Sequence, residues 1–227
     1  MDALLLDYNG VVVKDEHLHF ESFREALRGM GIAITREDYD RTYLGVDDRA
    51  AFRKAYELHG RRVTADDLER EVQEKSRRYR ALAERSLDLV PGVGRFVRRA
   101  ARHCHVAVVS GALGIEIPPG LARAGIADLV EVLLSSDDVS TSKPDPTSYR
   151  TALRRLAERH GDGSWRAVVI EDSLPGIEAA RNLGAGCVAI TTSHPAAALT
   201  EADVVWDSFE GHEPSELGPL WRSVAPL

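Results

Sequence analysis

Five polar side chains in this chain of 227 residues lie where they could act together on a phosphate group, each at or shortly after the end of a short apolar run. In chain order they are Asp7, Ser110, Lys143, Glu171 and Asp172. An aspartate can attack phosphorus and carry the phosphoryl group as an aspartyl-phosphate. A serine hydroxyl and a lysine ammonium can hold the transferring oxygens, and carboxylates can place Mg²⁺, which prefers oxygen ligands. Because each residue alone is more typical of a cap or a turn, their joint order predicts phosphoryl chemistry.

The hydrophobic pattern predicts a scaffold that brings these residues together. Short, continuously apolar runs alternate with helical patterns, which is typical of a parallel sheet covered by helices on both faces. The predicted strands are Ala3–Leu6, His105–Val109, Leu129–Leu134, Ala167–Ile170, Cys187–Ile190 and Asp203–Trp206, and the helices between them are 93–104, 146–160 and 175–183. In such a sheet the carboxyl ends of the strands meet at one crevice, where ligands bind. The predicted fold class is therefore α/β, with a doubly wound, Rossmann-like parallel sheet.

The segment from about residue 15 to residue 85 breaks this alternation, because it contains helical patterns only. The predicted helices are Asp15–Arg28, Arg36–Tyr43, Asp47–His59 and Ala65–Arg85. Thr35 and Thr64 are each followed three residues later by an aspartate, a spacing that resembles a helix N-terminal capping signal. We therefore expect a helical cap domain at 14–88, inserted into an α/β core domain made of 1–13 and 89–227. The last residues, 218–227, give little signal and are expected to form a loosely docked tail.

Composition narrows the classes of protein that fit. With 44% hydrophobic and 29% charged residues the chain has the composition of a soluble globular protein. A net charge of −7 argues against nucleic acid or an anionic membrane as a partner, since both favour a basic face. The sequence holds neither a membrane-length apolar run nor a signal peptide, so we expect a cytoplasmic protein. Cys104 and Cys187 form no CxxC pair and are expected to be core residues, not part of a disulfide or zinc site.

Four motifs resemble those of the haloacid dehalogenase superfamily, in the branch with a helical cap after the first strand that includes phosphoglycolate phosphatases and β-phosphoglucomutases. They are LLLDYNGV at 4–11, VVSGA at 108–112, SKPDP at 142–146 and VIEDSLPGI at 169–177. The motifs appear in the family's order and at family-like distances over essentially the whole chain. This resemblance is specific for the fold and the general chemistry, and it says little about the substrate.

The resemblance implies a role for each motif residue. Asp7 would be the nucleophile and a ligand of Mg²⁺, and Asp172 a second metal ligand, with Glu171 in support through water. Ser110 and Lys143 would bind the phosphoryl oxygens, and Lys143 would also neutralise Asp7. The implied reaction is phosphoryl transfer from a small phosphorylated metabolite, with hydrolysis of a phosphate monoester as the outcome.

One position departs from the family pattern. In the phosphatases and phosphomutases of the superfamily, the residue two after the nucleophile is a second aspartate, which acts as general acid and then as general base. Here that residue is Asn9. Its backbone carbonyl can still face the metal, but its side-chain amide can neither donate nor accept the proton. Since general acid–base catalysis contributes about 10²–10⁴-fold, ordinary phosphatase turnover is expected to be weakened by about that factor.

Three interpretations of Asn9 stay open. The protein is a slow or specialised phosphatase that takes its proton from another group, with His19 as a candidate, or a degenerate relative that binds phosphorylated ligands without turnover. In the third, Asn9 deamidates to aspartate, because asparagine followed by glycine is prone to that reaction. A separate enzymatic alternative is a hydrolase of another leaving group, such as a halide, which needs no protonation.

Substrate contacts are expected from two glycines and from the cap. Gly10 and Gly111 lie in the first two motifs, and the missing Cβ of Gly10 allows the backbone to approach the phosphate closely. In the cap, Arg49 follows a glycine-containing loop and is suited to a second anionic group. His19 and Lys75 match site-facing cap positions of β-phosphoglucomutase-like proteins. The remaining histidines show no metal-ligand spacing and are assigned no role. No surface is predicted to form a dimer.

Overall fold

The computed structural model describes residues 1–161 and 164–224. The chain divides into two compact units, one made of Met1–Lys14 and Asp88–Leu227 and the other of Asp15–Leu87. The first unit contains the sheet, and the second is entirely helical. That the second unit closes over the first as a cap stays a prediction.

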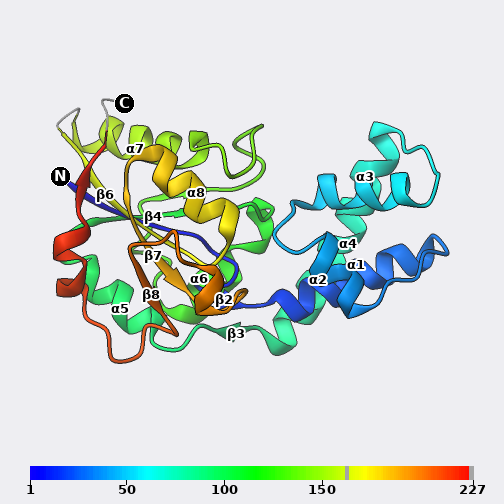
Figure 1. Ribbon diagram of the computed structural model, residues 1–227, viewed down its shortest axis with the longest axis horizontal. Helices are drawn as coiled ribbons and strands as arrows, with labels where there is room; N and C mark the ends of the chain where they lie inside the picture. The colour runs from blue at the N-terminus through cyan, green and yellow to red at the C-terminus, as the bar shows by residue number, and fades with distance from the viewer. Residues whose placement is uncertain (162–163, 225–227) are drawn as a thin grey trace. The chain divides into compact units, whose positions relative to one another are not determined.

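The first unit is built on a seven-stranded sheet (Figure 1). Six strands are parallel, in the order β5 (Val132–Leu134), β4 (His105–Val109), β1 (Asp2–Leu6), β6 (Arg166–Glu171), β7 (Gly186–Ile190) and β8 (Val204–Trp206). Strand β1 is central, with Leu5 opposite Ala107 on one side and Val169 on the other. This confirms the predicted parallel, Rossmann-like sheet, and it places the ends of β1, β4 and β6 next to one another.

Helices cover both faces of this sheet, which is why its strands are apolar throughout. The helices of this unit are α5 (Val93–Ala100), α6 (Pro118–Ala124), α7 (Thr147–His160) and α8 (Leu174–Leu183). Ala3 and Leu5 face α7 and α8, in one buried cluster with Leu153 and Ile177. Leu4 and Leu6 point to the other face and are also fully buried, and α5 lies on that side (Figure 1).

Some predicted elements extend further along the chain than the helices and strands that form. The run Leu129–Leu134 gives a strand only from Val132, because the Leu129 N–H bonds back to the Ile126 carbonyl in a turn. Helix α5 ends at Ala100 instead of Cys104, where tighter turn bonds replace the helical ladder. Cys187 is buried as expected, and Cys104 is only partly buried; both are free thiols.

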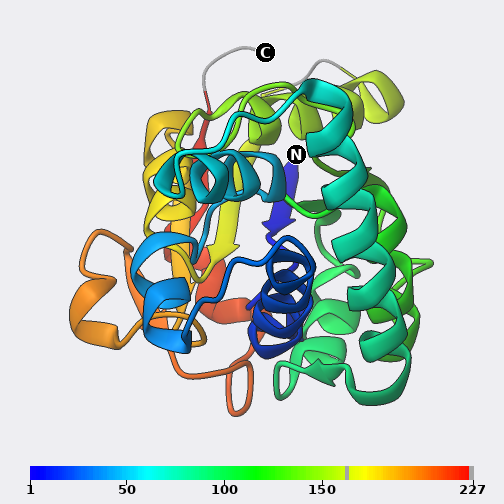
Figure 2. The same ribbon diagram turned by 90° about the vertical axis from the view of Figure 1, so that its right-hand side faces the viewer.

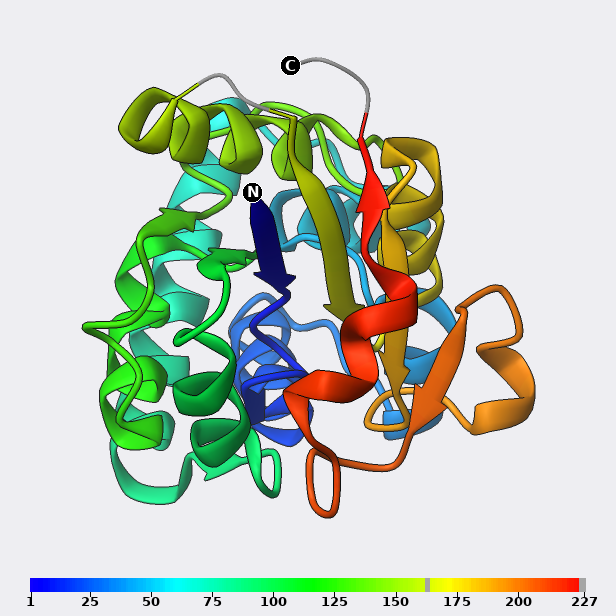
Figure 3. The same ribbon diagram turned by 90° about the vertical axis from the view of Figure 1, so that its left-hand side faces the viewer.

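The end of the chain is more ordered than the sequence suggested. The 3₁₀ helix η3 (Pro214–Leu220) leads into β9 (Arg222–Ser223), which pairs antiparallel with Arg166–Ala167 at the start of β6. Figure 3 shows β9, in red, running against β6. The prediction of a loosely docked tail is therefore wrong for 218–224, because backbone hydrogen bonds tie this segment to the sheet. Residues 225–227 lie outside the described part of the chain.

The helical unit contains α1 (Glu16–Gly29), α2 (Arg36–Thr42), α3 (Asp48–Leu58) and α4 (Ala65–Ser86), coloured blue to cyan-green in Figure 2. Both capping predictions are confirmed. Thr35 accepts from the Asp38 N–H in a full capping box, and Thr64 accepts from the Asp67 N–H. The interior of the unit is aromatic, with Phe23 against Tyr43 and Phe52. Across residues 1–161 and 164–224, no helix is long and apolar enough to cross a bilayer.

Short elements complete the first unit. Strands β2 (Val13–Lys14) and β3 (Asp88–Leu89) pair antiparallel at the two points where the chain passes between the units. Two further 3₁₀ helices, η1 (Gly114–Glu116) and η2 (Ala196–Ala198), lie in loops that follow β4 and β7.

Candidate active site

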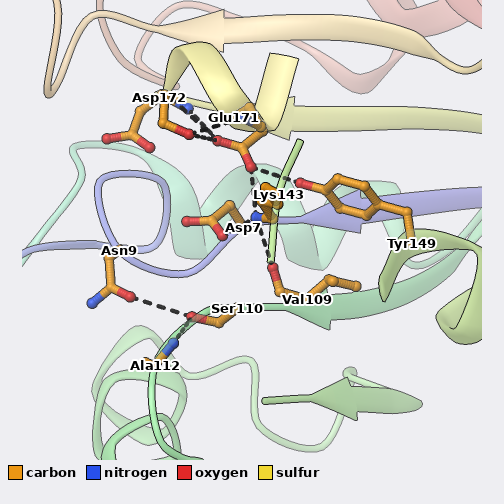
Figure 4. A network of polar contacts seen from close by, with 11 residues as sticks. Asp7, Asn9, Val109, Ser110, Ala112, Lys143, Tyr149, Glu171 and Asp172 are labelled. Carbon is orange, nitrogen blue, oxygen red and sulfur yellow. Dashed lines mark hydrogen bonds and ion pairs between the residues drawn. The ribbon is translucent and has the colours of Figure 1, made fainter. Parts of the chain in front are cut away.

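The centre of the site is an ion-pair cluster at the carboxyl ends of β1 and β6. Lys143 Nζ lies 2.5 Å from Asp7 Oδ1 and 2.6 Å from Glu171 Oε1. It also donates to the Val109 carbonyl at 3.3 Å, at the end of β4 (Figure 4). The Asp7 N–H bonds to the Ile170 carbonyl and so continues the ladder between β1 and β6. Sheet pairing thus fixes both carboxylates, and the lysine from the 142–146 loop bridges them.

Burial and charge together set the protonation of this cluster. Burial raises the pKa of Asp7 to about 7; Lys143 opposes this rise and the Glu171 carboxylate adds to it. Burial also disfavours the charged form of Lys143, but its two carboxylate partners outweigh that effect and raise its pKa. Burial favours a higher pKa for Glu171, but Lys143 and the hydrogen-bond donors around the carboxylate outweigh it, so the pKa of Glu171 is lowered. Glu171 is therefore the firmly ionised member of the pair of acids.

Glu171 is fully buried and holds its neighbours in place. Its Oε1 accepts from Lys143 and from the Tyr149 hydroxyl at 2.7 Å. Its Oε2 accepts from the Asp172 N–H at 3.0 Å, and from the N–H and hydroxyl of Ser173 at 3.2 and 3.0 Å. The Ser173 hydroxyl also caps α8 by accepting from the Gly176 N–H. Because both carboxylate oxygens are already used, Glu171 is suited to a positioning role.

Asp172 lies beside the turn that follows β1. A Cβ built on Gly10 would lie 1.8 Å from Asp172 Oδ2, and Gly10 has a φ of +75°. Only a glycine allows that backbone conformation together with so close a carboxylate. The Ser193 hydroxyl, from the loop after β7, donates to the same Oδ2. Gly10 was predicted for its approach to a phosphate; what the structure shows is its approach to Asp172.

Ser110 and Asn9 meet at the end of β4. The Ser110 hydroxyl donates to Asn9 Oδ1 at 3.2 Å and accepts from the Ala112 N–H at 3.0 Å (Figure 4). Ser110 is 5% exposed, so its hydroxyl lies at the buried edge of the site. Gly111, which lies between Ser110 and Ala112 in the chain, has no atom within 4 Å of the place where a Cβ would stand. The side chain at the position that would carry a general acid is thus an amide hydrogen-bonded to the Ser110 hydroxyl.

The carboxylates of this site suit a hard cation. Asp7, Glu171 and Asp172 each offer an oxygen within 4.8 Å of the others. In the ion pairs of this cluster, among the described residues, Lys143 is the one cation, and it pairs with Asp7 and Glu171. The set therefore keeps an excess of negative charge and only oxygen donors, which is what Mg²⁺ prefers.

The remaining predicted residues lie in the helical unit. Lys75 is almost fully buried; its Nζ lies 2.6 Å from His19 Nδ1 and 2.9 Å from Asp48 Oδ2. Arg49 is more exposed and donates to Glu69 at 3.0 Å. His19 also stacks on Tyr79, with ring centroids 4.3 Å apart. The structure thus brings His19 and Lys75 together and places Arg49 in a separate ion pair.

Sequence reasoning missed Tyr149, Ser193 and the second role of Ser173. Tyr149 is fully buried on α7, its ring centroid 4.9 Å from Lys143 Nζ, and nothing in the local sequence distinguishes it from a core aromatic. Ser193 lies 21 residues beyond its partner Asp172. The helix-capping position of Ser173, directly after two acids, is a signal that could have been used.

Comparison with known proteins agrees with this geometry. Residues 4–190 match the family described as haloacid dehalogenase-like hydrolase. The chain belongs to this family. It is therefore an enzyme of the hydrolase class, on the α/β fold that the strand order already shows.

Three curated family relatives illustrate the range of similarity. Validoxylamine A 7'-phosphate phosphatase of Streptomyces hygroscopicus subsp. limoneus is 40% identical over 99 residues, which cover 44% of this chain and 45% of that protein. Protein CbbY of Cereibacter sphaeroides is 30% identical over 97% of this chain and 95% of its own length. The phosphorylated carbohydrates phosphatase of Thermotoga maritima is 29% identical, over 81% of this chain and 82% of that one.

Solved structures give the same result. CbbY from Rhodobacter sphaeroides in complex with phosphate superposes with a TM-score of 0.75 at 26% identity, over 95% of this chain and 96% of that one. A CbbY mutant in complex with xylulose-(1,5)bisphosphate gives 0.76 at 25% identity, over 92% and 95%. β-Phosphoglucomutase from Clostridium difficile gives 0.81 at 18% identity, over 96% and 95%, a likeness of fold alone.

Proposed function

We propose that this chain is a phosphatase that hydrolyses a small phosphorylated carbohydrate through an aspartyl-phosphate on Asp7, with Mg²⁺ as its cofactor. The observation that carries the proposal is the 2.5 Å contact of Lys143 Nζ with Asp7, among buried acids and close to the end of β4, where Ser110 follows. Two relatives matched over most of the chain support the substrate class, because one is a phosphorylated carbohydrates phosphatase and the other, CbbY, has a mutant structure in complex with xylulose-(1,5)bisphosphate.

The chain's own residues account for most of the reaction. An Asp7 oxygen attacks phosphorus in line with the leaving oxygen, so that an Asp7–phosphorus bond forms and the bond to the sugar oxygen breaks. Water then attacks the same phosphorus, releases inorganic phosphate and restores the Asp7 carboxylate. Lys143 keeps Asp7 oriented and neutralises charge on the phosphoryl oxygens, and the Ser110 hydroxyl binds one of those oxygens.

A divalent cation fits the donors of the site. The carboxylates of Asp7 and Asp172 and the main-chain carbonyl of Asn9 would hold Mg²⁺, with Glu171 acting through the positions of Asp172 and Lys143. When bound, the ion supplies positive charge that polarises the phosphoryl group and offsets the repulsion between an acidic site and an anionic substrate.

The proton for the leaving sugar oxygen does not come from Asn9, because a neutral amide holds no proton that it can give up near pH 7. The amide oxygen of Asn9 is used as an acceptor from Ser110 at 3.2 Å. The alcohol must therefore take its proton from solvent or from another group, and His19 stays the candidate from the helical unit. This step is where we expect the rate to fall by about 10²–10⁴-fold relative to an enzyme with a carboxylic acid there.

Asn9 also favours a second candidate function, binding of a phosphorylated ligand without turnover. Such a protein would keep Asp7, Lys143, Ser110 and the acidic cluster, all of which the structure contains. The two functions differ in one observable, the release of phosphate over time.

The deciding experiment measures Mg²⁺-dependent phosphate release from a panel of sugar monophosphates, sugar bisphosphates including xylulose-1,5-bisphosphate, and phosphoglycolate. It compares the natural chain with Asn9→Asp and uses Asp7→Asn as the inactive control. We expect slow release by the natural chain, abolished by EDTA, and release about 10²–10⁴-fold faster from Asn9→Asp. Release by the variant alone would refute turnover by the natural chain and leave it a binding protein or a crippled enzyme with an intact phosphate site. Halide release from 2-haloacids without added metal would show that the leaving group is a halide and that the reaction is not phosphoryl transfer.

Arg49 and Lys75 stay proposed substrate contacts, together with His19. A sharp test for Arg49 uses substrates with one and with two phosphate groups. Arg49→Ala should raise the KM for the bisphosphate and leave that for the monophosphate nearly unchanged, since the guanidinium suits a second anionic group. The matched control is Arg53→Ala, an exposed arginine one turn further along α3. Equal KM values for Arg49→Ala and the natural chain would remove Arg49 from the substrate site.

A further inference from the structure

A second cluster of ligand-type side chains lies at the other end of the sheet from the proposed active site. His105 is the first residue of β4, Glu131 immediately precedes β5, and His160 is the last residue of α7. Ser110 follows the opposite end of β4. Five residues of extended chain at about 3.3 Å each separate His105 from Ser110 by about 16 Å. The cluster is therefore distinct from the acidic site at the carboxyl ends.

The three side chains already converge on one point. His105 Nδ1 lies 2.8 Å from Glu131 Oε1, and His160 Nε2 lies 2.5 Å from Glu131 Oε2. The centroids of the two imidazole rings lie 4.0 Å apart. Each of the three residues offers one ligand atom, and these three atoms all lie within 4.8 Å of one another. Tetrahedral zinc ligands at 2.0–2.2 Å from the ion are about 3.3–3.6 Å apart, so small side-chain rotations suffice.

One backbone and one side-chain hydrogen bond tie together the elements that carry the three ligands. The Glu131 N–H bonds to the Val106 carbonyl at 2.9 Å, which ties Glu131 to the strand that carries His105. The Arg159 guanidinium donates to the Glu131 carbonyl, which ties the end of α7 to the same residue. Pre-organised ligands lose less freedom when an ion binds, and this favours affinity.

The chemistry of the donors and their exposure identify the kind of ion. Two imidazole nitrogens and one carboxylate are a zinc-type donor set, whereas Mg²⁺ favours oxygen ligands alone. The side chains of His105, Glu131 and His160 are 28%, 31% and 32% exposed. An ion can therefore enter from solvent, and water can fill the fourth position.

We propose that His105, Glu131 and His160 form a binding site for a divalent transition-metal ion of the zinc type. Binding replaces the two imidazole–carboxylate hydrogen bonds by three metal–ligand bonds. The protons held in those two hydrogen bonds leave the ligand atoms when the ion binds. The ion would link the end of α7 to β4 and to the start of β5, and so brace the edge of the sheet. The proposal does not depend on the proposed function of the acidic site.

The test is a calorimetric titration of the full chain, free of any histidine tag and stripped with EDTA, with ZnCl₂ in saturating Mg²⁺. We expect one equivalent of zinc to bind the natural chain under these conditions. His105→Gln and His160→Gln should each weaken that binding by about 100-fold or more, since loss of even an outer-shell partner costs 10–100-fold. Asp172→Asn should leave it unchanged, which separates this site from the acidic one.

The matched control is His212→Gln. Its imidazole lies 2.9 Å from the Glu216 carboxylate, a histidine–glutamate pair outside the metal-type clusters found among residues 1–161 and 164–224. It should bind zinc like the natural chain. As a second readout, zinc at 100 times its Kd should raise the Tm of the natural chain by about 5–11 °C and leave that of His160→Gln unchanged. Zinc binding that survives in both cluster variants, or no binding by the natural chain, would overturn the proposal.

Discussion

Replacing Gly10 with alanine tests how the site holds Asp172. At a φ of +75° a Cβ would stand 1.8 Å from Asp172 Oδ2 and 2.3 Å from its Cγ, whereas real Cβ contacts stay beyond 3.0 Å. The carboxylate must therefore move by about 1 Å, and displacements of that size at a catalytic group cost about 10²-fold in rate. The left-handed backbone adds roughly 1–2 kcal/mol of destabilisation. In a chain of this length that lowers the Tm by about 2–8 °C.

The control separates the backbone effect from the displacement. Gly184 ends α8 with a φ of +84° and has no atom within 4 Å of a built Cβ, so Gly184→Ala carries the strain alone. Both variants are measured by thermal unfolding and by calorimetric Mg²⁺ binding. We expect a Tm loss in both and a Mg²⁺ affinity about 10–100-fold lower in Gly10→Ala only, since disturbing groups around a metal site costs about that much affinity. If the two variants bind Mg²⁺ equally well, Asp172 is not held against Gly10, or it is not a metal ligand.

Three further outcomes follow from the contacts described. Tyr149→Phe removes a hydroxyl donor to the buried Glu171 carboxylate. The free energy of unfolding should fall by about 1.5–3 kcal/mol, which lowers the Tm in thermal melts by about 3–12 °C. An unchanged Tm would mean that this hydrogen bond contributes nothing to stability. Burial raises the pKa of Cys104 to about 12 and that of Cys187 further, so at pH 8 alkylation by iodoacetamide, followed by mass, should be about 10³-fold slower in the native chain than after unfolding. Rapid native labelling would contradict those raised pKa values. Leu153→Ala, fully buried between α7 and the sheet, should cost about 2–5 kcal/mol in urea unfolding, and a cost below 1 kcal/mol would show that α7 packs loosely.

Much of the fold could be predicted because its strands are buried on both faces. A strand such as His105–Val109 reads as a continuous apolar run, and its boundaries were confirmed. Capping signals at Thr35 and Thr64 were reliable for a similar reason, since the side chain and its backbone partner are only three residues apart. Local patterns and strongly buried runs are what a sequence displays directly.

The rest depends on contacts that no local pattern records. Strand β9 has two residues and pairs with Arg166 and Ala167, the part of β6 that lies before its pairing with β7 begins at Val168. His105 and His160 are 55 positions apart and were assigned no role, yet the parallel topology places both against Glu131. The resemblance to a family likewise named Glu171 without showing that Tyr149 and Ser173 hold it.

The order of synthesis has a consequence for how this sheet comes together. Strand β1, which Asp7 follows, is translated before its partners β4 and β6, which end at Val109 and Glu171. At a translation rate of 5–20 residues per second, synthesis of β6 is complete roughly 8–33 s after that of β1. The unit Asp15–Leu87 is continuous in sequence and is complete long before that. On the ribosome the helical unit can therefore fold while the apolar strand that precedes it is still unpaired, and an unpaired apolar strand is open to aggregation.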